Sequence, residues 1–272
     1  MNKRKFLGCV AATMAAPAVW AQKTDTFVIA INEGVTYRDP TGLGADRFAE
    51  VTSDLQKILK RPVRFHQVRR YPELVEGMKQ SAYDLAYVHP THHALRAVKR
   101  DGYHTLALTK GFTEYRAAFM VKKESPLKTL ADLKGRKVGA PDEDSITSVI
   151  ARATLHDNLP ALPEMTYVRY QDAVPFMVEN NLSVSGVSAS KSVVKAWADG
   201  GGRILATCKP VPIKHMIAST NVPSQQRDEI AAYFLALEQT GEGKSRLKAL
   251  NVAGFVGFEQ AALTDIGKWL GV

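Results

Sequence analysis

Three hydroxyl-bearing residues at the predicted start of one helix could bind a small anion. Ser145, Thr147 and Ser148 lie within one helical turn, which Asp144 or Ser145 can cap. The first four N–H groups of a helix have no partner inside it, and the helix dipole makes that end positive. An anion bound there collects several donors. We therefore expect Ser145, Thr147 and Ser148 to contact a ligand, although the same residues could be only a cap and polar surface.

A histidine-rich segment opens another predicted helix. It reads His89-Pro90-Thr91-His92-His93 and follows a predicted strand. Ligands of open α/β sheets bind at the carboxyl ends of strands. There Thr91 can donate a hydrogen bond, and His89 and His92 can donate one or become charged. A helix cap on a solvated face is the alternative. The segment lacks a clear carboxylate partner and is a weak zinc signal, so we expect no metal and no cofactor.

Two tyrosines and one cysteine are the other candidates. Tyr37 follows the first predicted strand and Tyr87 lies in the third. Either phenol could donate a hydrogen bond across a cleft, although Tyr87 could equally be a packed aromatic. Cys208 is the single cysteine downstream of the N-terminal segment, so the mature chain can form no internal disulfide. We expect Cys208 to be a small buried residue. A soft ligand such as trivalent arsenic would usually need more thiols.

The elements that must position these residues alternate between strand and helix. Short apolar runs predict strands at 26–32, 63–68, 84–88 and 105–109. Apolar residues at helical spacing predict helices at 45–59, 71–80 and 91–99. This order predicts a mostly parallel sheet with helices on both faces.

The same alternation then starts again. Strands are predicted at 116–121, 137–140, 165–170, 184–187, 203–208 and 215–219. Helices are predicted at 129–133, 145–155, 173–179, 190–198, 224–238, 242–250 and 259–269. We predict an α/β fold of two Rossmann-like lobes with mixed sheets, joined by a two-segment hinge that closes around a ligand. Lobe 1 would take residues 22–114 plus 216–272, terminal helices included, and lobe 2 would take 115–215.

The N-terminus is typical of a secretory signal peptide. A basic start, Met1–Lys5, precedes a mostly apolar stretch and a Val19-Trp20-Ala21 cleavage signal, so residues 1–21 are predicted to be removed on export to the periplasm. No later apolar run is long enough to span a bilayer. The net charge of +9 arises from 36 basic and 27 acidic residues. That excess suits an anion-tolerant surface but falls short of a nucleic-acid-binding signature.

Four segments resemble the type II periplasmic solute-binding proteins, in particular the phosphonate/phosphite/phosphate-binding family of ABC transporters. Residues 31–33 (INE), followed by Tyr37, resemble the family's first strand and its ligand-facing tyrosine. Residues 83–90 (YDLAYVHP) resemble the family's D-L-A-hydrophobic-x-x-P turn, and residues 130–139 (LADLKGRKVG) its L-x-D-L-K-G-K-x-V segment. Residues 144–148 (DSITS) resemble the hydroxyl-rich helix start that holds oxyanions. The chain departs from the family at Val149, at residues 180–184 and at residues 170–172, and His89, His92 and His93 are unexpected in it.

The resemblance implies a periplasmic receptor that captures a small oxyanion between two lobes and delivers it to a membrane permease. A protein of the same fold that signals to a sensor kinase, for example for an arsenic or sulfur oxyanion, is the alternative. The sequence contains none of the common hydrolase, metalloprotease, P-loop or dinucleotide motifs. We therefore expect no enzyme activity. We also expect no nucleic-acid partner, and we expect the protein to be a monomer.

Overall fold

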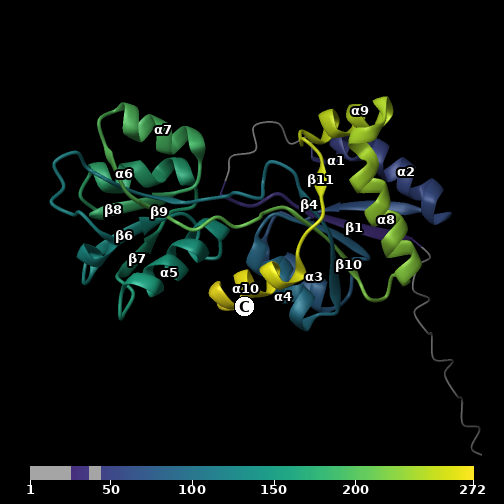
Figure 1. Ribbon diagram of the computed structural model, residues 1–272, viewed down its shortest axis with the longest axis horizontal. Helices are drawn as coiled ribbons and strands as arrows, with labels where there is room; N and C mark the ends of the chain where they lie inside the picture. The colour runs from purple at the N-terminus through teal and green to yellow at the C-terminus, as the bar shows by residue number, and fades with distance from the viewer. Residues whose placement is uncertain (1–25, 37–43) are drawn as a thin grey trace, which may run out of the picture.

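The computed structural model describes residues 26–36 and 44–272, which form two lobes side by side (Figure 1). Each lobe is built on one mixed sheet flanked by helices, as the sequence predicts. The predicted signal peptide and Tyr37 lie outside the described residues. No helix in the described part of the chain is both long and apolar enough to cross a membrane.

The sheet of lobe 1 has six strands in the order β11-β4-β10-β3-β1-β2. The strands are β1 (Phe27–Asn32), β2 (Val63–Gln67), β3 (Leu85–Val88), β4 (Tyr103–Thr109), β10 (His215–Ser219) and β11 (Phe255–Val256). The first four run in one direction, as predicted, but β10 inserts between β3 and β4 and is antiparallel to both. The two-residue strand β11, which the sequence analysis did not predict, extends the edge beside β4.

The helices of lobe 1 follow their predicted positions. They are α1 (Gly44–Arg47), α2 (Ala49–Leu59), α3 (Tyr71–Lys79) and α4 (Thr91–Arg100). Helix α2 buries Val51, Leu55 and Leu59, which recur every four residues and so share one face. That face packs on the core built around β1, whose Phe27 is fully buried. Because β1 and β3 are covered on both faces, they are continuous apolar runs.

The sheet of lobe 2 has five strands in the order β7-β6-β8-β5-β9. They are β5 (Ala118–Val121), β6 (Lys137–Ala140), β7 (Glu164–Tyr167), β8 (Ser185–Ser188) and β9 (Arg203–Thr207). Only β5 runs against the others among these strands. The helices are α5 (Ile146–Asn158), α6 (Val174–Glu179) and α7 (Lys191–Asp199), with short 3₁₀ turns at Leu130–Leu133 and Gln171–Ala173.

Two antiparallel segments connect the lobes. The first runs from the end of β4 to β5, and the second returns from β9 to β10. They are bonded to each other, because the N–H groups of Tyr115 and Val211 each donate to the other's carbonyl at 3.0 Å. Ile213 N also donates to Phe112 O at 2.8 Å. The pair therefore has the geometry of the predicted two-segment hinge.

The C-terminal helices are divided differently from the expectation. Helices α8 (Ser224–Ala236) and α9 (Gly241–Leu250) pack on the core of lobe 1, as predicted. Helix α10 (Gln260–Trp269) packs beside α4 but also reaches lobe 2, and in Figure 1 it lies between the lobes. Its Trp269 Nε1 donates to Asp157 Oδ2 at 3.0 Å. Helix α10 therefore contacts both lobes, and helical periodicity alone does not reveal the contact that Trp269 makes with lobe 2.

Candidate functional site

The candidate site lies where the strands of both sheets end, beside the hinge. His89 follows β3 directly, Ser145 follows β6 by a short turn, and Ala189 follows β8. The antiparallel strands β10 and β5 begin at this same edge, since His215 pairs with Val88 and Ala118 pairs with Ser188. The carboxyl ends of the parallel strands in both lobes therefore face one junction, which is where open α/β sheets bind ligands.

The beginning of α4 is buried at this junction. His89, Thr91, His92 and His93 all have less than a twentieth of their surface exposed, so the solvated-face alternative is wrong. His89 N donates to Asn32 O at 2.9 Å, which ties the segment to the end of β1. The Thr91 hydroxyl donates to Pro212 O in the hinge. Thr91 thus fixes the helix to the returning hinge segment, and its proton is already used.

His89 lies against a turn that requires glycine. Gly34 follows β1 with a φ of +92°, and a Cβ there would lie 2.9 Å from Cδ2 of His89. Full burial lowers the pKa of His89 to about 3, and nearby Lys214 adds to this effect. At neutral pH His89 is therefore an uncharged donor or acceptor, and not the imidazolium that the sequence left open.

The beginning of α5 uses two of its three predicted hydroxyls internally. Ser145 Oγ accepts from Ser148 N at 3.2 Å and so caps the helix. The Ser145 hydroxyl donates to Ser148 Oγ at 3.3 Å, and Ser148 Oγ donates to Pro141 O at 2.7 Å. Thr147 differs, because its Oγ1 lies 2.8 Å from Oη of Tyr115 in the hinge. Of the three, Thr147 is the hydroxyl directed at the junction.

Gln171 in lobe 2 has its side-chain oxygen held by three donors. Gln171 Oε1 accepts from Ser188 Oγ at 3.0 Å, Ala189 N at 2.7 Å and Ser190 N at 2.8 Å. An amide nitrogen could accept none of these protons, so the contacts fix which end of the amide is which. The Gln171 NH₂ group must therefore face the opposite way, toward the junction.

The NH₂ group of Gln171 points at hydroxyls from the hinge and from lobe 1. Its Nε2 lies 3.5 Å from Tyr115 Oη and 3.4 Å from Thr36 Oγ1. Gln171 N also donates to Thr36 O at 3.2 Å. The Tyr115 ring meets His89 edge-on, with ring centroids 6.1 Å apart. Tyr115 is thus the point where His89, Thr147 and Gln171 converge.

Tyr87 is placed apart from this group. It is buried in the core of lobe 1, against Phe48 and Phe255. Thr109 Oγ1 donates to Lys214 O at 2.9 Å, so the 3.1 Å contact between Tyr87 Oη and Thr109 Oγ1 must carry the tyrosine proton. Burial raises the pKa of this phenol. The structure therefore favours the alternative of a packed aromatic, and Tyr87 has no proton left for a ligand.

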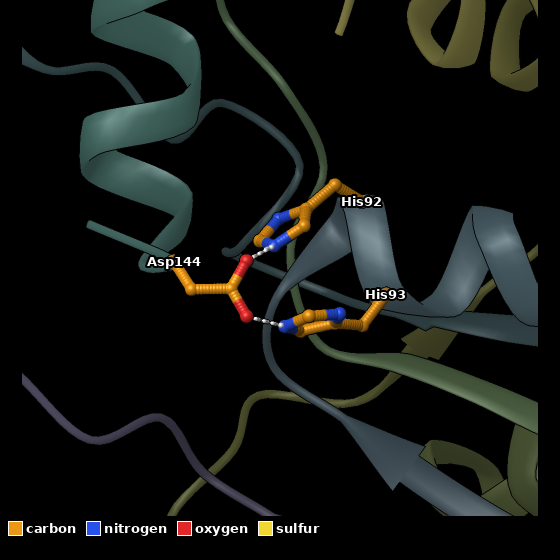
Figure 2. A group of neighbouring side chains, drawn as sticks. All are labelled: His92, His93 and Asp144. Carbon is orange, nitrogen blue, oxygen red and sulfur yellow. Dashed lines mark hydrogen bonds and ion pairs between the residues drawn. The ribbon is translucent and has the colours of Figure 1, made fainter. Parts of the chain in front are cut away.

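His92 and His93 reach across from lobe 1 to one carboxylate of lobe 2. His92 Nε2 lies 3.2 Å from Oδ1 of Asp144, and His93 Nε2 lies 3.1 Å from Oδ2, so each imidazole faces a different oxygen (Figure 2). Burial alone would raise the pKa of Asp144, but the contacts with the two histidines outweigh it and hold that pKa below its usual range. The carboxylate partner that the sequence analysis did not find is therefore Asp144.

The protons of this cluster follow from its partners. An ionised carboxylate only accepts, so its contacts place a proton on Nε2 of both histidines. The His92 contact is a hydrogen bond, whereas the His93 contact at 3.1 Å is an ion-pair contact without hydrogen-bond geometry. Arg96 NH1 lies 3.5 Å from Nδ1 of His93 and can only donate to it, which agrees with that tautomer. His92 Nδ1 is buried and has no hydrogen-bond partner among the described residues. Burial lowers the pKa of His92 to about 4, so this imidazole is neutral at pH 7.

Two cationic side chains lie on the lobe 1 side of the hinge. Arg47 pairs with Glu33, and Lys214 Nζ lies 3.9 Å from the other oxygen of Glu33. Lys214 also sits 4.2 Å from the centroid of the Phe112 ring. Burial lowers the pKa of Lys214, and Glu33 opposes that shift. Because Arg47 and Lys214 share the single carboxylate of Glu33, this side of the junction has an excess of positive charge.

Tyr115, Gln171 and Lys214 are candidate site residues that sequence analysis did not select. Tyr115 and Lys214 lie in the predicted hinge, so their position was an available signal. Gln171 stands in residues 170–172, where the chain departs from the resembled family. Cys208, in contrast, is buried in the core of lobe 2, as expected, and burial raises the pKa of its thiol to about 11.

Several solved structures share this architecture at low sequence identity. XAC2383 from Xanthomonas citri bound to ATP matches with a TM-score of 0.75 and 13% identity, over 91% of this chain and 98% of that one. PhnD1 from Prochlorococcus marinus in complex with methylphosphonate matches with a TM-score of 0.67 and 15% identity, over 90% of this chain and 97% of that one. A binding protein component of an ABC phosphonate transporter from Pseudomonas aeruginosa matches with a TM-score of 0.63 and 15% identity, over 90% of this chain and 85% of that one. These likenesses establish the fold of type II periplasmic binding proteins.

The family follows from the sequence itself. No relative among curated proteins matches the chain. The model of the family described as "ABC transporter, phosphonate, periplasmic substrate-binding protein" matches residues 37–263, which is most of the chain. The chain with this two-lobed fold and polar interlobe junction belongs to the phosphonate-binding family of periplasmic substrate-binding proteins of ABC transporters.

Proposed function

We propose that the protein captures a small oxyanion of the phosphate, phosphite or phosphonate class between its lobes and delivers it to an ABC permease. The observation that carries this proposal is the convergence of His89, Thr147 and Gln171 on Tyr115. These groups come from lobe 1, lobe 2 and the hinge, so a ligand among them would be gripped by all three parts of the fold.

The chemistry of the group suits an anion held by neutral donors. Hydroxyl, amide and uncharged imidazole groups replace the water around an oxyanion without placing an unpaired charge in a buried site. The oxygen of Gln171 is occupied, so its NH₂ group is the end that can face a ligand. Lys214 and Arg47 supply the long-range attraction that draws an anion in.

Two helix beginnings reinforce this preference. Helices α4 and α5 start at the junction from opposite lobes, with Thr91 and Thr147 in their first turns. The positive dipole end of a helix, with the N–H groups of its first turn, favours negative charge. By analogy with the methylphosphonate complex of PhnD1, a phosphonate is the first ligand to test. Export to the periplasm, action as a monomer and the absence of enzyme activity are parts of the same proposal.

A thermal-shift and calorimetric screen tests the proposal. The probes are inorganic phosphate, phosphite, methylphosphonate, ethylphosphonate and sulfate. A cognate anion at about 100 times its Kd should raise the Tm by about 5–10 °C. No shift with any of these anions would contradict an oxyanion function.

A pair of threonine variants tests the location of the site. Thr147→Val removes the hydroxyl directed at Tyr115 and should weaken the best anion about 10-fold. Thr154→Val is the matched control, because Thr154 is buried in the same helix and its hydroxyl donates to Ile150 O at 2.8 Å, away from Tyr115. Equal affinity in the two variants would place the site elsewhere.

A further inference from the structure

We propose that His92, His93 and Asp144 form a binding site for a divalent transition-metal ion, with Zn²⁺ as the reference ion, that joins the two lobes. Their ligand atoms all lie within 4.8 Å of one another, and no other three histidine, cysteine or carboxylate side chains of residues 26–36 and 44–272 come as close. The cluster lies at the beginnings of α4 and α5, which the proposed function also uses, but its ligand atoms are not those assigned to the oxyanion, so the inference does not depend on the proposed function.

The side chains already point at one centre. Both imidazoles project from the first turn of α4 toward the carboxylate that precedes α5 (Figure 2). The two rings lie side by side, with centroids 4.0 Å apart. An ion between their Nε2 atoms and one or both oxygens of Asp144 needs a contraction of the cluster to metal–ligand distances of about 2.0–2.2 Å. The contraction starts from side chains whose ligand atoms already lie within 4.8 Å of one another.

The donor set and its surroundings suit a borderline metal. Imidazole nitrogens and a carboxylate oxygen are ligands that Zn²⁺, Ni²⁺ and Cu²⁺ share. The histidines are buried, but about half of the Asp144 side chain is exposed, which leaves a path for the ion and a position for a water ligand. A site of three protein ligands with one open position results.

Binding requires a rearrangement of protons but no net release. The proton on each Nε2 must move to the Nδ1 of the same ring, through solvent, so that Nε2 can coordinate the ion. Nδ1 of His92 is buried without a partner among the described residues and can take a proton. Nδ1 of His93 can do so once Arg96, at 3.5 Å, turns away. Metal binding therefore replaces the two imidazole–carboxylate contacts and the Arg96 contact with metal–ligand bonds, and it places a proton on the unpartnered Nδ1 of His92.

An ion at this place would act on the arrangement of the lobes. Two ligands come from lobe 1 and one from lobe 2, so only the arrangement in which the lobes touch offers all three. A ligand that binds one conformation better shifts the population toward it. The metal should therefore favour the closed form, whether or not an oxyanion is bound.

Calorimetry with ZnCl₂ on untagged, chelator-treated protein tests the site. We expect one ion per chain, with affinity reduced about 10–100-fold in both Asp144→Asn and His93→Gln. His66→Gln is the matched control, since His66 forms an exposed pair with Glu73 at 3.3 Å and should leave the affinity unchanged. Two variants are used because Asp144→Asn, at a half-exposed position, keeps the fold even if a histidine variant does not.

Two further readouts separate the outcomes. Co²⁺ in place of Zn²⁺ should give the visible absorption of a four-coordinate site, and small-angle scattering should show a smaller radius of gyration with the metal in wild type only. Zinc binding that is equally strong in wild type and Asp144→Asn, or lost equally in His66→Gln, would overturn the proposal. Methylphosphonate titrations of the same proteins report on the oxyanion site independently.

Discussion

Gln171 and Asp144 both belong to lobe 2 and both contact lobe 1, yet they are held in opposite ways. Gln171 is neutral and buried, and its oxygen takes three hydrogen bonds from its own lobe. Asp144 is charged and half-exposed, and its oxygens face two imidazoles of the other lobe. The first residue is positioned before the lobes meet, and the second acquires its partners when they meet.

The two residues therefore respond differently when the lobes separate. When the lobes separate, Gln171 loses its contacts of 3.2 and 3.4 Å to Thr36 of lobe 1, and the three donors that hold its oxygen stay with it. Separation leaves Asp144 to water, which serves an exposed carboxylate well, but removes the carboxylate that both histidines contact. Gln171 is therefore a preorganised part of lobe 2, whereas the Asp144 contact is specific to the closed arrangement.

The largest expected effect on stability comes from removing the preorganised hydrogen bonds of Gln171. Gln171→Leu leaves the hydroxyl of Ser188 and the N–H of Ala189 buried without their acceptor, whereas Ser190 N keeps Ser188 Oγ at 3.2 Å. The loss should lower the free energy of unfolding by about 3 kcal/mol. Urea denaturation followed by circular dichroism measures this. Gln225→Leu on α8, where the amide only meets Glu229 at an exposed site, should change stability by less than about 0.5 kcal/mol. Equal losses would mean that the three donors find other partners.

The sequence could predict features that depend on neighbouring residues, but not those that depend on distant ones. Strand and helix positions were foreseeable because the apolar period sets them residue by residue, as in Val51, Leu55 and Leu59. The insertion of β10 between β3 and β4 was not, because strand order depends on pairings between residues about 130 positions apart, such as Ile217 with Ala86. Local pattern carries no such information.

The sequence predicted which segments form the candidate site, but not which of their side chains face the junction. The beginnings of α4 and α5 do meet at the junction, as their positions after strands indicate. Which hydroxyl faces outward was not foreseeable: Ser145 and Ser148 bond each other, and Thr147 alone faces Tyr115. Gln171 was missed for the same reason, since a glutamine becomes a fixed donor only when its oxygen is occupied by distant residues.

A smaller effect comes from a buried group that makes no contact between lobes. His215 Nε2 lies 3.2 Å from Pro212 O, and burial lowers the pKa of His215 to about 4, against about 6.5 when unfolded. The unfolded chain therefore binds more protons between these values, so stability should fall as pH drops from 7 to 5, by about 2 kcal/mol for this residue.

Urea midpoints at pH 7 and pH 5 measure that pH dependence. His215→Gln can keep a donor for Pro212 and should remove about 2 kcal/mol of the pH-dependent loss, although His89 and His92 titrate in the same window and remain. His156→Gln, at an exposed position, should leave the slope as in wild type. A slope unchanged in His215→Gln would show that this histidine is solvated or charged in the native state.

The smallest effect concerns the contact between the lobes, measured without metal. Asp144→Asn should change the free energy of unfolding by less than about 1 kcal/mol, because the side chain at position 144 is half-exposed and an amide there can still contact both histidines. His93 keeps its proton on Nε2, since Arg96 faces its Nδ1, and donates to the asparagine oxygen. The asparagine NH₂ then faces His92.

His92 can accept that hydrogen bond only by changing tautomer. Its proton must move from Nε2 to Nδ1, the nitrogen that has no partner among the described residues. Long-range ¹H–¹⁵N correlation spectra should therefore show the His92 tautomer reversed in Asp144→Asn and the His93 tautomer unchanged. Reversal in both rings, or in neither, would contradict the proton assignment. Because the Gln171 contact lies in another part of the junction and keeps its partners within lobe 2, its resonances should not respond.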